Sequence, residues 1–105
     1  MNADASPFTD RQRRGAHLGN VTYALRTHLM SPSEGHKPIY AAIKLARGAG
    51  CDDASLIQAL NEGLAAENER IGNVNIPAEQ LIAEAGRDPM TLTEAREYLD
   101  EIGFG

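Results

Sequence analysis

Residues 52–72 read DDASLIQALNEGLAAENERIG, and this stretch decides the fold class. Its large apolar residues recur every three or four positions, which is the spacing that lines up one face of an α-helix. These residues are Leu56, Ile57, Leu60, Leu64 and Ile71. A carboxylate of Asp52 or Asp53 can cap the start of the helix, and Gly72 can end it in a left-handed conformation. The stretch therefore predicts one long amphipathic helix.

Two capping boxes predict the starts of two further helices. Thr9 is followed three residues later by Gln12, and Thr91 by Glu94. In such a pair, the two side chains satisfy two free backbone amides reciprocally. The first box leads into an apolar stripe that reaches residue 30, and the second leads into a short stripe that ends at Gly103.

Prolines and glycines bound the remaining two helices. Pro38 stands where a first-turn proline is tolerated, and the apolar stripe after it stops at Gly48 and Gly50. Pro77 likewise opens a helix that Gly86 is expected to close. No stretch shows a convincing strand pattern.

Length and composition fit the same fold class. The chain of 105 residues is the size of one domain, and its hydrophobic fraction of 42% comes mainly from Ala, Leu and Ile, with two Phe, three Tyr and no Trp. Such a composition suits helix-on-helix packing. We therefore expect an all-α protein, a compact bundle of four to five short amphipathic helices. Residues 9–105 form its single helical domain, and residues 1–8 form a flexible N-terminal tail.

Cysteine use and hydropathy indicate a compartment. Cys51 is the only cysteine, so no intramolecular disulfide can form. The N-terminus lacks a basic segment followed by an apolar run, and no stretch approaches the roughly 20 apolar residues that cross a bilayer. We expect a cytoplasmic protein with no membrane contact, and our hypothesis places it in bacteria.

Charge is distributed unevenly along the chain. Residues 1–47 carry seven Lys or Arg and three Asp or Glu, a net charge of +4, whereas residues 48–105 carry three Arg and twelve Asp or Glu, a net charge of −9. Such asymmetry steers association and orients partners. Acidic pairs such as Glu67 and Glu69 are expected to lie on a solvated helix face.

The residue types that catalyse reactions or hold metals do not form a persuasive pattern. His17 and His28 are separated by about three helical turns, roughly 16 Å, which is too far for one ion. Asp52 and Asp53 would disfavour a thiolate at the neighbouring Cys51. We therefore expect no enzymatic activity, no metal and no cofactor.

Two stretches resemble parts of DNA-binding proteins. Residues 45–56, LARGAGCDDASL, resemble a helix–turn–helix, with Gly50 at the tight turn between the two helices. Residues 90–99, MTLTEAREYL, are similar to the opening helix of excisionase-type DNA-binding domains, although no recognition helix follows them. DNA binding is opposed by Asp52 and Asp53, which would point two carboxylates at the phosphates.

Protein binding is the function that these observations favour. We expect a small non-enzymatic regulatory protein that masks or antagonises, for example, a transcription regulator. The alternative is a helix–turn–helix-like DNA-binding transcriptional regulator. The partner is another protein, and a homodimer is possible. Candidate partner-binding residues are Arg11, Arg14, Leu18, Val21, Tyr23, Leu25, Tyr40, Tyr98 and Phe104. The apolar and aromatic members of this set can instead belong to the core, and both interpretations stay open at this point.

Overall fold

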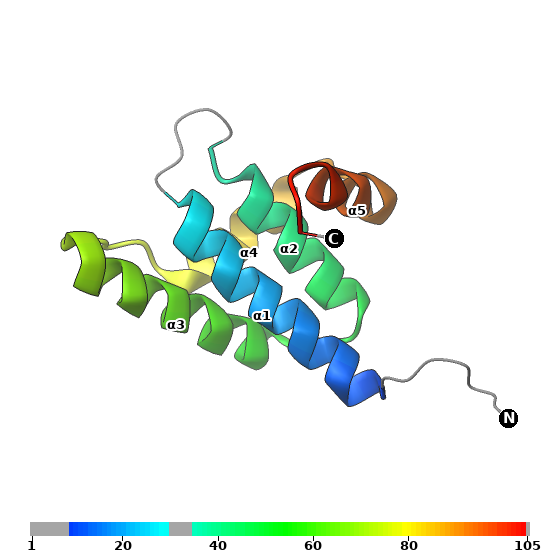
Figure 1. Cartoon of the computed structure of the whole chain (residues 1–105), viewed down its shortest axis with the longest axis horizontal. Helices are drawn as coiled ribbons and strands as arrows, with labels where there is room; N and C mark the ends of the chain where they lie inside the picture. Colours follow the sequence, from blue (N-terminus) through cyan, green and yellow to red (C-terminus); the bar gives the residue numbers. More distant parts are fainter. Residues whose placement is uncertain (1–8, 30–34, 105) are drawn as a thin grey trace, which may run out of the picture.

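Figure 1 shows the computed structural model, which describes residues 9–29 and 35–104. These residues form five helices, α1 (Asp10–His28), α2 (Lys37–Gly48), α3 (Asp53–Ile71), α4 (Ala78–Arg87) and α5 (Leu92–Glu101). Neither described segment contains a strand, so the predicted all-α fold is confirmed. The predicted tail at residues 1–8 lies outside the described residues, as does most of the predicted break after Met30.

Helix α2 is at the centre of the bundle. It packs against α1, α4 and α5, while α3 packs against α1 and α4. In the view of Figure 1, α4 lies behind α2 and α1 lies in front. Six of the twelve residues of α2 are buried, namely Pro38, Ile39, Ala41, Ala42, Ile43 and Ala46. Its small and aliphatic side chains let three helices pack around it.

Helices α1 and α3 run side by side in the same direction. The Thr22 Oγ1 hydroxyl of α1 donates a hydrogen bond to the Ala59 carbonyl of α3 at 2.8 Å. One turn further along both helices, Gly63 meets Leu25. A Cβ atom built on Gly63 would lie 3.1 Å from Leu25 Cδ2 and 3.3 Å from the Thr22 carbonyl oxygen. Glycine at position 63 therefore permits this close approach.

The predicted helix starts agree closely with the structure. Both capping boxes are present, and in the first the Gln12 amide donates to Thr9 Oγ1 at 3.1 Å. Asp52, rather than Asp53, caps α3 by accepting a hydrogen bond from the Ser55 amide at 2.8 Å. Gly72 follows α3 with a φ of 73°, so its predicted role as a stop is confirmed.

The predicted end of α4 was wrong. Gly86 remains helical, and α4 continues to Arg87. Asp88 then adopts an extended conformation with φ −69° and ψ 135°. A residue before proline is disfavoured in the helical region by the proline ring, and Asp88 precedes Pro89. Pro89 therefore ends α4, and Gly86 lies within it.

Candidate functional site

The outward side of α1 carries no Asp, Glu, Lys or Arg along its middle turns. Between Arg14 and Arg26, no Asp, Glu, Lys or Arg occurs, although several side chains there are exposed. We call the exposed positions of this run the α1 face: Gly15, Ala16, Gly19 and Tyr23. Solvent-facing helix positions are ordinarily polar or charged, so an uncharged stretch is a candidate contact surface.

Tyr23 gives the α1 face an aromatic side chain. It is 57% exposed, the most exposed large hydrophobic side chain in the described part of the chain. Tyrosine is enriched at interfaces because it offers a large apolar ring together with a hydroxyl group. Tyr23 was a predicted partner-binding residue, and its exposure leaves the ring accessible to a partner.

The two glycines of the α1 face have no packing reason within the described part of the chain. A Cβ atom built on Gly15 or Gly19 would meet no other atom within 4 Å. Glycine inside a helix costs about 1 kcal/mol relative to alanine. At Gly15 and Gly19, this loss of helix stability is not accompanied by a close contact between helices like the one at Gly63. An open glycine surface does allow the backbone of another molecule to approach closely.

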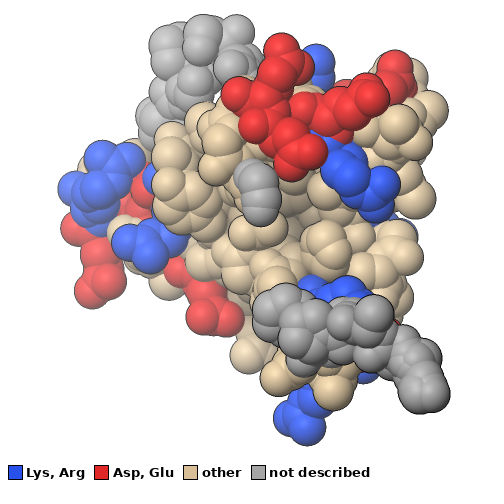
Figure 2. Space-filling model, turned by 45° about the vertical axis from the view of Figure 1, so that its right-hand side comes forward, with Lys and Arg blue, Asp and Glu red and all other residues tan. Residues whose placement is uncertain are grey.

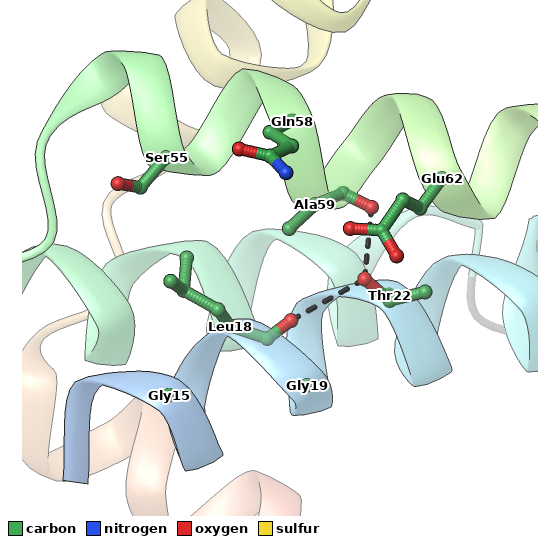
Figure 3. A pocket seen from close by; sticks show the side chains of 8 residues that line it. All are labelled: Gly15, Leu18, Gly19, Thr22, Ser55, Gln58, Ala59 and Glu62. Atoms are coloured by element: carbon green, nitrogen blue, oxygen red, sulfur yellow. Dashed lines mark hydrogen bonds between the residues drawn. The ribbon is translucent and has the colours of Figure 1, made fainter. Parts of the chain in front are cut away.

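A groove runs between α1 and α3 beside the α1 face (Figure 3). It has a volume of about 440 Å³ and is lined by Gly15, Leu18, Gly19, Thr22, Ser55, Gln58, Ala59 and Glu62. Thr22 Oγ1, held by the Ala59 carbonyl, closes the floor of the groove between the two helices. The groove extends the α1 face toward α3 with a mixture of apolar and polar groups.

The C-terminal segment borders the α1 face on its other side. Gly103 has a φ of 96°, and the Phe104 amide donates to the Leu99 carbonyl at 2.8 Å, which turns the chain back toward α1. The Phe104 ring then meets Tyr23 edge to face, with ring centroids 5.2 Å apart. Its centroid is also 6.0 Å from that of His28. Two predicted partner-binding residues, Tyr23 and Phe104, are thus brought together.

The predicted arginines lie at the N-terminal end of α1. Arg11 is exposed, whereas Arg14 is half-buried. The Arg14 side chain lies against the turn at Gly50, and its carbonyl oxygen accepts a contact from Cys51 Sγ at 3.7 Å. Burial raises the pKa of the Cys51 thiol, and the positive charge of Arg14 opposes this shift only in part. Arg11 is therefore the more accessible of the two predicted cations.

Val21 and Leu25 belong to the core. Both side chains are fully buried, with 0% exposure, on the inner side of α1. The sequence left open whether they contact a partner or the core, and the structure places them in the core, because positions four apart on α1 both point toward its neighbouring helices. We therefore remove them from the partner-binding set. Leu18 is half-buried and keeps a place in that set as a lining residue of the groove.

Tyr40 connects α2 to α4 and does not reach the α1 face. Its hydroxyl donates to Glu84 Oε1 at 2.7 Å, and Gln80 Nε2 donates to the other carboxylate oxygen at 3.0 Å. Burial and the Glu84 carboxylate raise the pKa of Tyr40 to about 12. The hydrogen bond from Tyr40 also lowers the pKa of Glu84. These contacts give Tyr40 an interhelical role.

Tyr98 has a comparable place between α5 and α2. It is half-buried, and Lys37 Nζ lies 4.5 Å from the centroid of its ring. A cation over an aromatic face is an attractive arrangement. Of the three predicted aromatic anchors other than Phe104, only Tyr23 belongs to the α1 face.

The turn that resembles a helix–turn–helix is tight, as expected. Gly50 has a φ of 98°, and the Cys51 amide donates to the Ala46 carbonyl at 3.0 Å. The helices on either side of it, however, each pack against α1 and α4. The first turn of α3 is anionic, with Asp52 as its cap and Asp53 paired to Arg47 Nη2 at 2.6 Å.

A second groove lies between α2 and α4. It has a volume of about 360 Å³ and is lined by Ile43, Lys44, Arg47, Gly48, Ala85, Gly86, Met90 and Leu92. Leu92 is 48% exposed at its edge. The two cations of the groove are already engaged, because Lys44 Nζ donates to the Asp88 carbonyl at 2.8 Å and Arg47 is paired to Asp53. This groove provides a comparison surface on another side of the molecule.

Glu67 was expected to be solvated, and that expectation was wrong. Its side chain is 3% exposed, and its Oε2 atom lies 2.5 Å from Arg70 Nη2. Arginine one turn further along the helix compensates for the buried charge. Within the described part of the chain, no group of three or more His, Cys, Asp or Glu side chains is arranged to hold a metal ion.

Gly15, Gly19 and the groove beside them were not predicted from the sequence. The available signal was the run of uncharged residues between Arg14 and Arg26, which is long for an exposed helix. The groove itself had no signal, because it forms only where α1 and α3, distant in sequence, run in parallel.

Comparison with known proteins finds no family model that matches the chain, no similar curated protein and no matching solved structure. Among the helices of the described segments, none combines the length and the apolar character needed to cross a bilayer.

Proposed function

We propose that the protein is a small, non-enzymatic cytoplasmic regulator that acts by binding another protein through the α1 face. Masking of a transcription regulator is the example that we favour. The observation that carries the proposal is the uncharged, exposed run of α1, in which Tyr23 stands beside two glycines with no packing reason.

The surroundings of the α1 face support a protein ligand. A contact surface needs a desolvated centre with an aromatic anchor and a polar rim. Tyr23 and Phe104 supply the aromatic part, and the groove toward α3 supplies a recess that an apolar side chain can enter. Arg11 and Arg26 stand at the two ends of the α1 face as exposed charges.

DNA binding stays a prediction that no contact among the described residues favours. The end of α3 that would meet DNA presents Asp53, and the cation nearest to it, Arg47, is paired with that carboxylate. Contacts with the phosphate backbone depend on free cations. We therefore propose protein binding alone.

The test compares two substitutions of the same kind on different sides of the molecule. Gly19→Glu places a charged side chain in the α1 face, and Gly86→Glu places the same side chain on α4. Both glycines are helical and exposed, and a Cβ atom on either meets nothing within 4 Å. The two variants should therefore fold equally well, which circular dichroism and thermal unfolding check.

The measurement is affinity purification of each tagged variant from lysate of the native cell, with quantitative mass spectrometry. We expect one protein to be recovered in stoichiometric amount with the wild type and with Gly86→Glu. Recovery with Gly19→Glu should fall by at least about tenfold, since burying an uncompensated charge at an interface costs several kcal/mol. Equal recovery by all three, or loss with Gly86→Glu alone, would contradict the α1 face as the binding surface.

A further inference from the structure

We propose that the α1 face also pairs with the α1 face of a second copy, about a two-fold axis that passes through the glycines. The inference deepens the proposed function, because it names an occupant of the same surface. Its test needs no other protein, so the two proposals can fail separately.

One end of this surface is acidic. Helix α5 carries one arginine and four carboxylates, and all four carboxylates, Glu94, Glu97, Asp100 and Glu101, are exposed. The segment that follows α5 places Phe104 against Tyr23, so this acidic end adjoins the Tyr23 end of the α1 face. Figure 2 shows a group of acidic side chains at the top of the molecule, with basic side chains directly beside it.

The opposite end is basic. Residues 10–14 contain three arginines and one aspartate. Arg13 is paired with Asp10 at 2.6 Å, and Arg11 is exposed. Twelve residues of helix separate Arg11 from Tyr23, a distance of about 18 Å. In Figure 2, basic side chains lie at the bottom of the same side, beside the N-terminal end of α1, and a largely uncharged area separates them from the acidic group.

A two-fold axis across the uncharged centre brings opposite ends together. The N-terminal arginines of each copy then meet the α5 carboxylates of the other, while Gly15 and Gly19 of both copies face each other in the middle. Small residues at the centre let two helix backbones approach closely, and the charges fix the antiparallel orientation. Such an interface uses the same patch on both copies, so the assembly closes as a dimer.

Other charges near this surface reduce the difference in charge between its two ends without reversing it. Arg26 is exposed on α1 toward the acidic end, and Arg96 belongs to α5 itself. Lys37 lies beside Tyr98 of α5, and Asp52 and Asp53 lie at the turn that Arg14 contacts, where Arg47 pairs with Asp53. With these counted, the acidic end keeps four carboxylates against three cations, and the basic end keeps four arginines against three aspartates. The two ends therefore remain opposite in sign.

The experiment measures self-association by sedimentation velocity over a range of protein concentrations. Arg11→Glu/Arg13→Glu makes the basic end acidic, and Glu97→Arg/Glu101→Arg makes the acidic end basic. A fourth protein combines all four substitutions. The matched control, Arg87→Glu/Glu79→Arg, reverses the same kinds of exposed charge on α4, which packs on another side of α2.

We expect the wild type to form dimers that weaken as ionic strength rises from about 50 mM to about 500 mM, because added salt shortens the range of charge attraction. Each double reversal should weaken dimerisation by about tenfold or more, and the fourfold variant should restore it, since its ends are opposite again. The control should dimerise as the wild type does. Recovery of dimers by the fourfold variant would show that the double reversals act on charge pairing and not on the fold.

A wild type that stays monomeric at low salt overturns the proposal, and so does a fourfold variant that fails to recover while remaining folded. Loss of dimers in the α4 control places the interface elsewhere and overturns it as well. If the wild type is monomeric but Gly19→Glu loses its target, the proposed function stands without the dimer. If dimers form as expected but no captured protein depends on Gly19, the dimer stands without the proposed function.

Discussion

The two sides of α1 differ in how closely they are packed. The inner side packs tightly against a glycine of α3, whereas the glycines of the outer side have open space next to them. On the inner side, Gly63 of α3 touches Leu25 so closely that a Cβ atom would come within 3.1 Å of it. On the outer side, a Cβ atom built on Gly15 or Gly19 would meet no atom of another described element within 4 Å. The same residue type is therefore explained by internal packing in one place and has no internal explanation in the other. The comparison separates residues that maintain the fold from residues available for binding.

The largest expected effect tests the inner side of α1. Leu25→Ala should lower the free energy of unfolding by about 3 kcal/mol, because a fully buried leucine loses its contacts and leaves a cavity. Urea denaturation followed by circular dichroism measures the loss. Tyr23→Ala, two residues away on the exposed side, is the control and should cost less than about 1 kcal/mol. Similar losses for the two variants would remove the distinction between the sides.

The next effect tests the close contact between α1 and α3 at Gly63. Gly63→Val should destabilise the protein by about 2 kcal/mol, because the added methyl groups would overpack against Leu25 and the Thr22 carbonyl. Thermal unfolding measures it, and Gly63→Ala should have a smaller effect of the same sign or none. A valine variant as stable as the wild type would show that α1 and α3 can separate without cost.

Alanine at the outer glycines should have the opposite effect on stability. Gly19→Ala should raise the free energy of unfolding by about 1 kcal/mol, because alanine is the better helix former and the space for its methyl group is open. The same variant should weaken binding at the α1 face if a partner backbone approaches there. A more stable protein with unchanged binding would mean that Gly19 is merely tolerated.

The smallest expected effect lies on the side of α2 that faces α4. Tyr40→Phe removes the hydrogen bond to Glu84 and should cost about 0.5–1 kcal/mol. The pKa of Tyr40 in the folded state is about 12, above its unfolded value near 10. Its contribution is therefore complete below pH 10 and is lost as pH rises toward 12.

Absorbance of the tyrosinate ion follows this titration directly. Subtraction of the Tyr40→Phe curve from the wild-type curve should leave one ionisation near pH 12. A difference curve centred near pH 10 would show that Tyr40 is exposed to solvent and that its bond to Glu84 does not persist. Binding at the α1 face should be the same in both proteins at neutral pH.

Local signals in the sequence were sufficient for most helix boundaries. Capping at Thr9, Asp52 and Thr91 depends on residues three positions apart, so it can be recognised in a short window. The prediction that Gly86 ends α4 was wrong, because the steric effect of Pro89 on the preceding residue decides where this helix ends.

The candidate site was only partly predictable, because its contacts join residues that are far apart in the sequence. Tyr23 and Phe104 were both named as candidates, but their contact joins residues that are far apart in sequence and follows from the turn at Gly103. Leu18, Val21 and Leu25 form one stripe by periodicity, yet the structure buries two of them and leaves Leu18 in the groove. Periodicity in the sequence identifies the residues that share a helix face. Only the packing of the helices decides how deeply each of these residues is buried.

The central place of α2 has a consequence for amide hydrogen exchange. Since α1, α4 and α5 all pack against it, the backbone amides of its buried residues are shielded from solvent as long as these helices stay in place. Their exchange should therefore report the unfolding of the whole molecule. The turns of α1 around Gly15 and Gly19 can open locally and should exchange much faster. A bound partner would slow exchange in these turns and leave α2 almost unchanged.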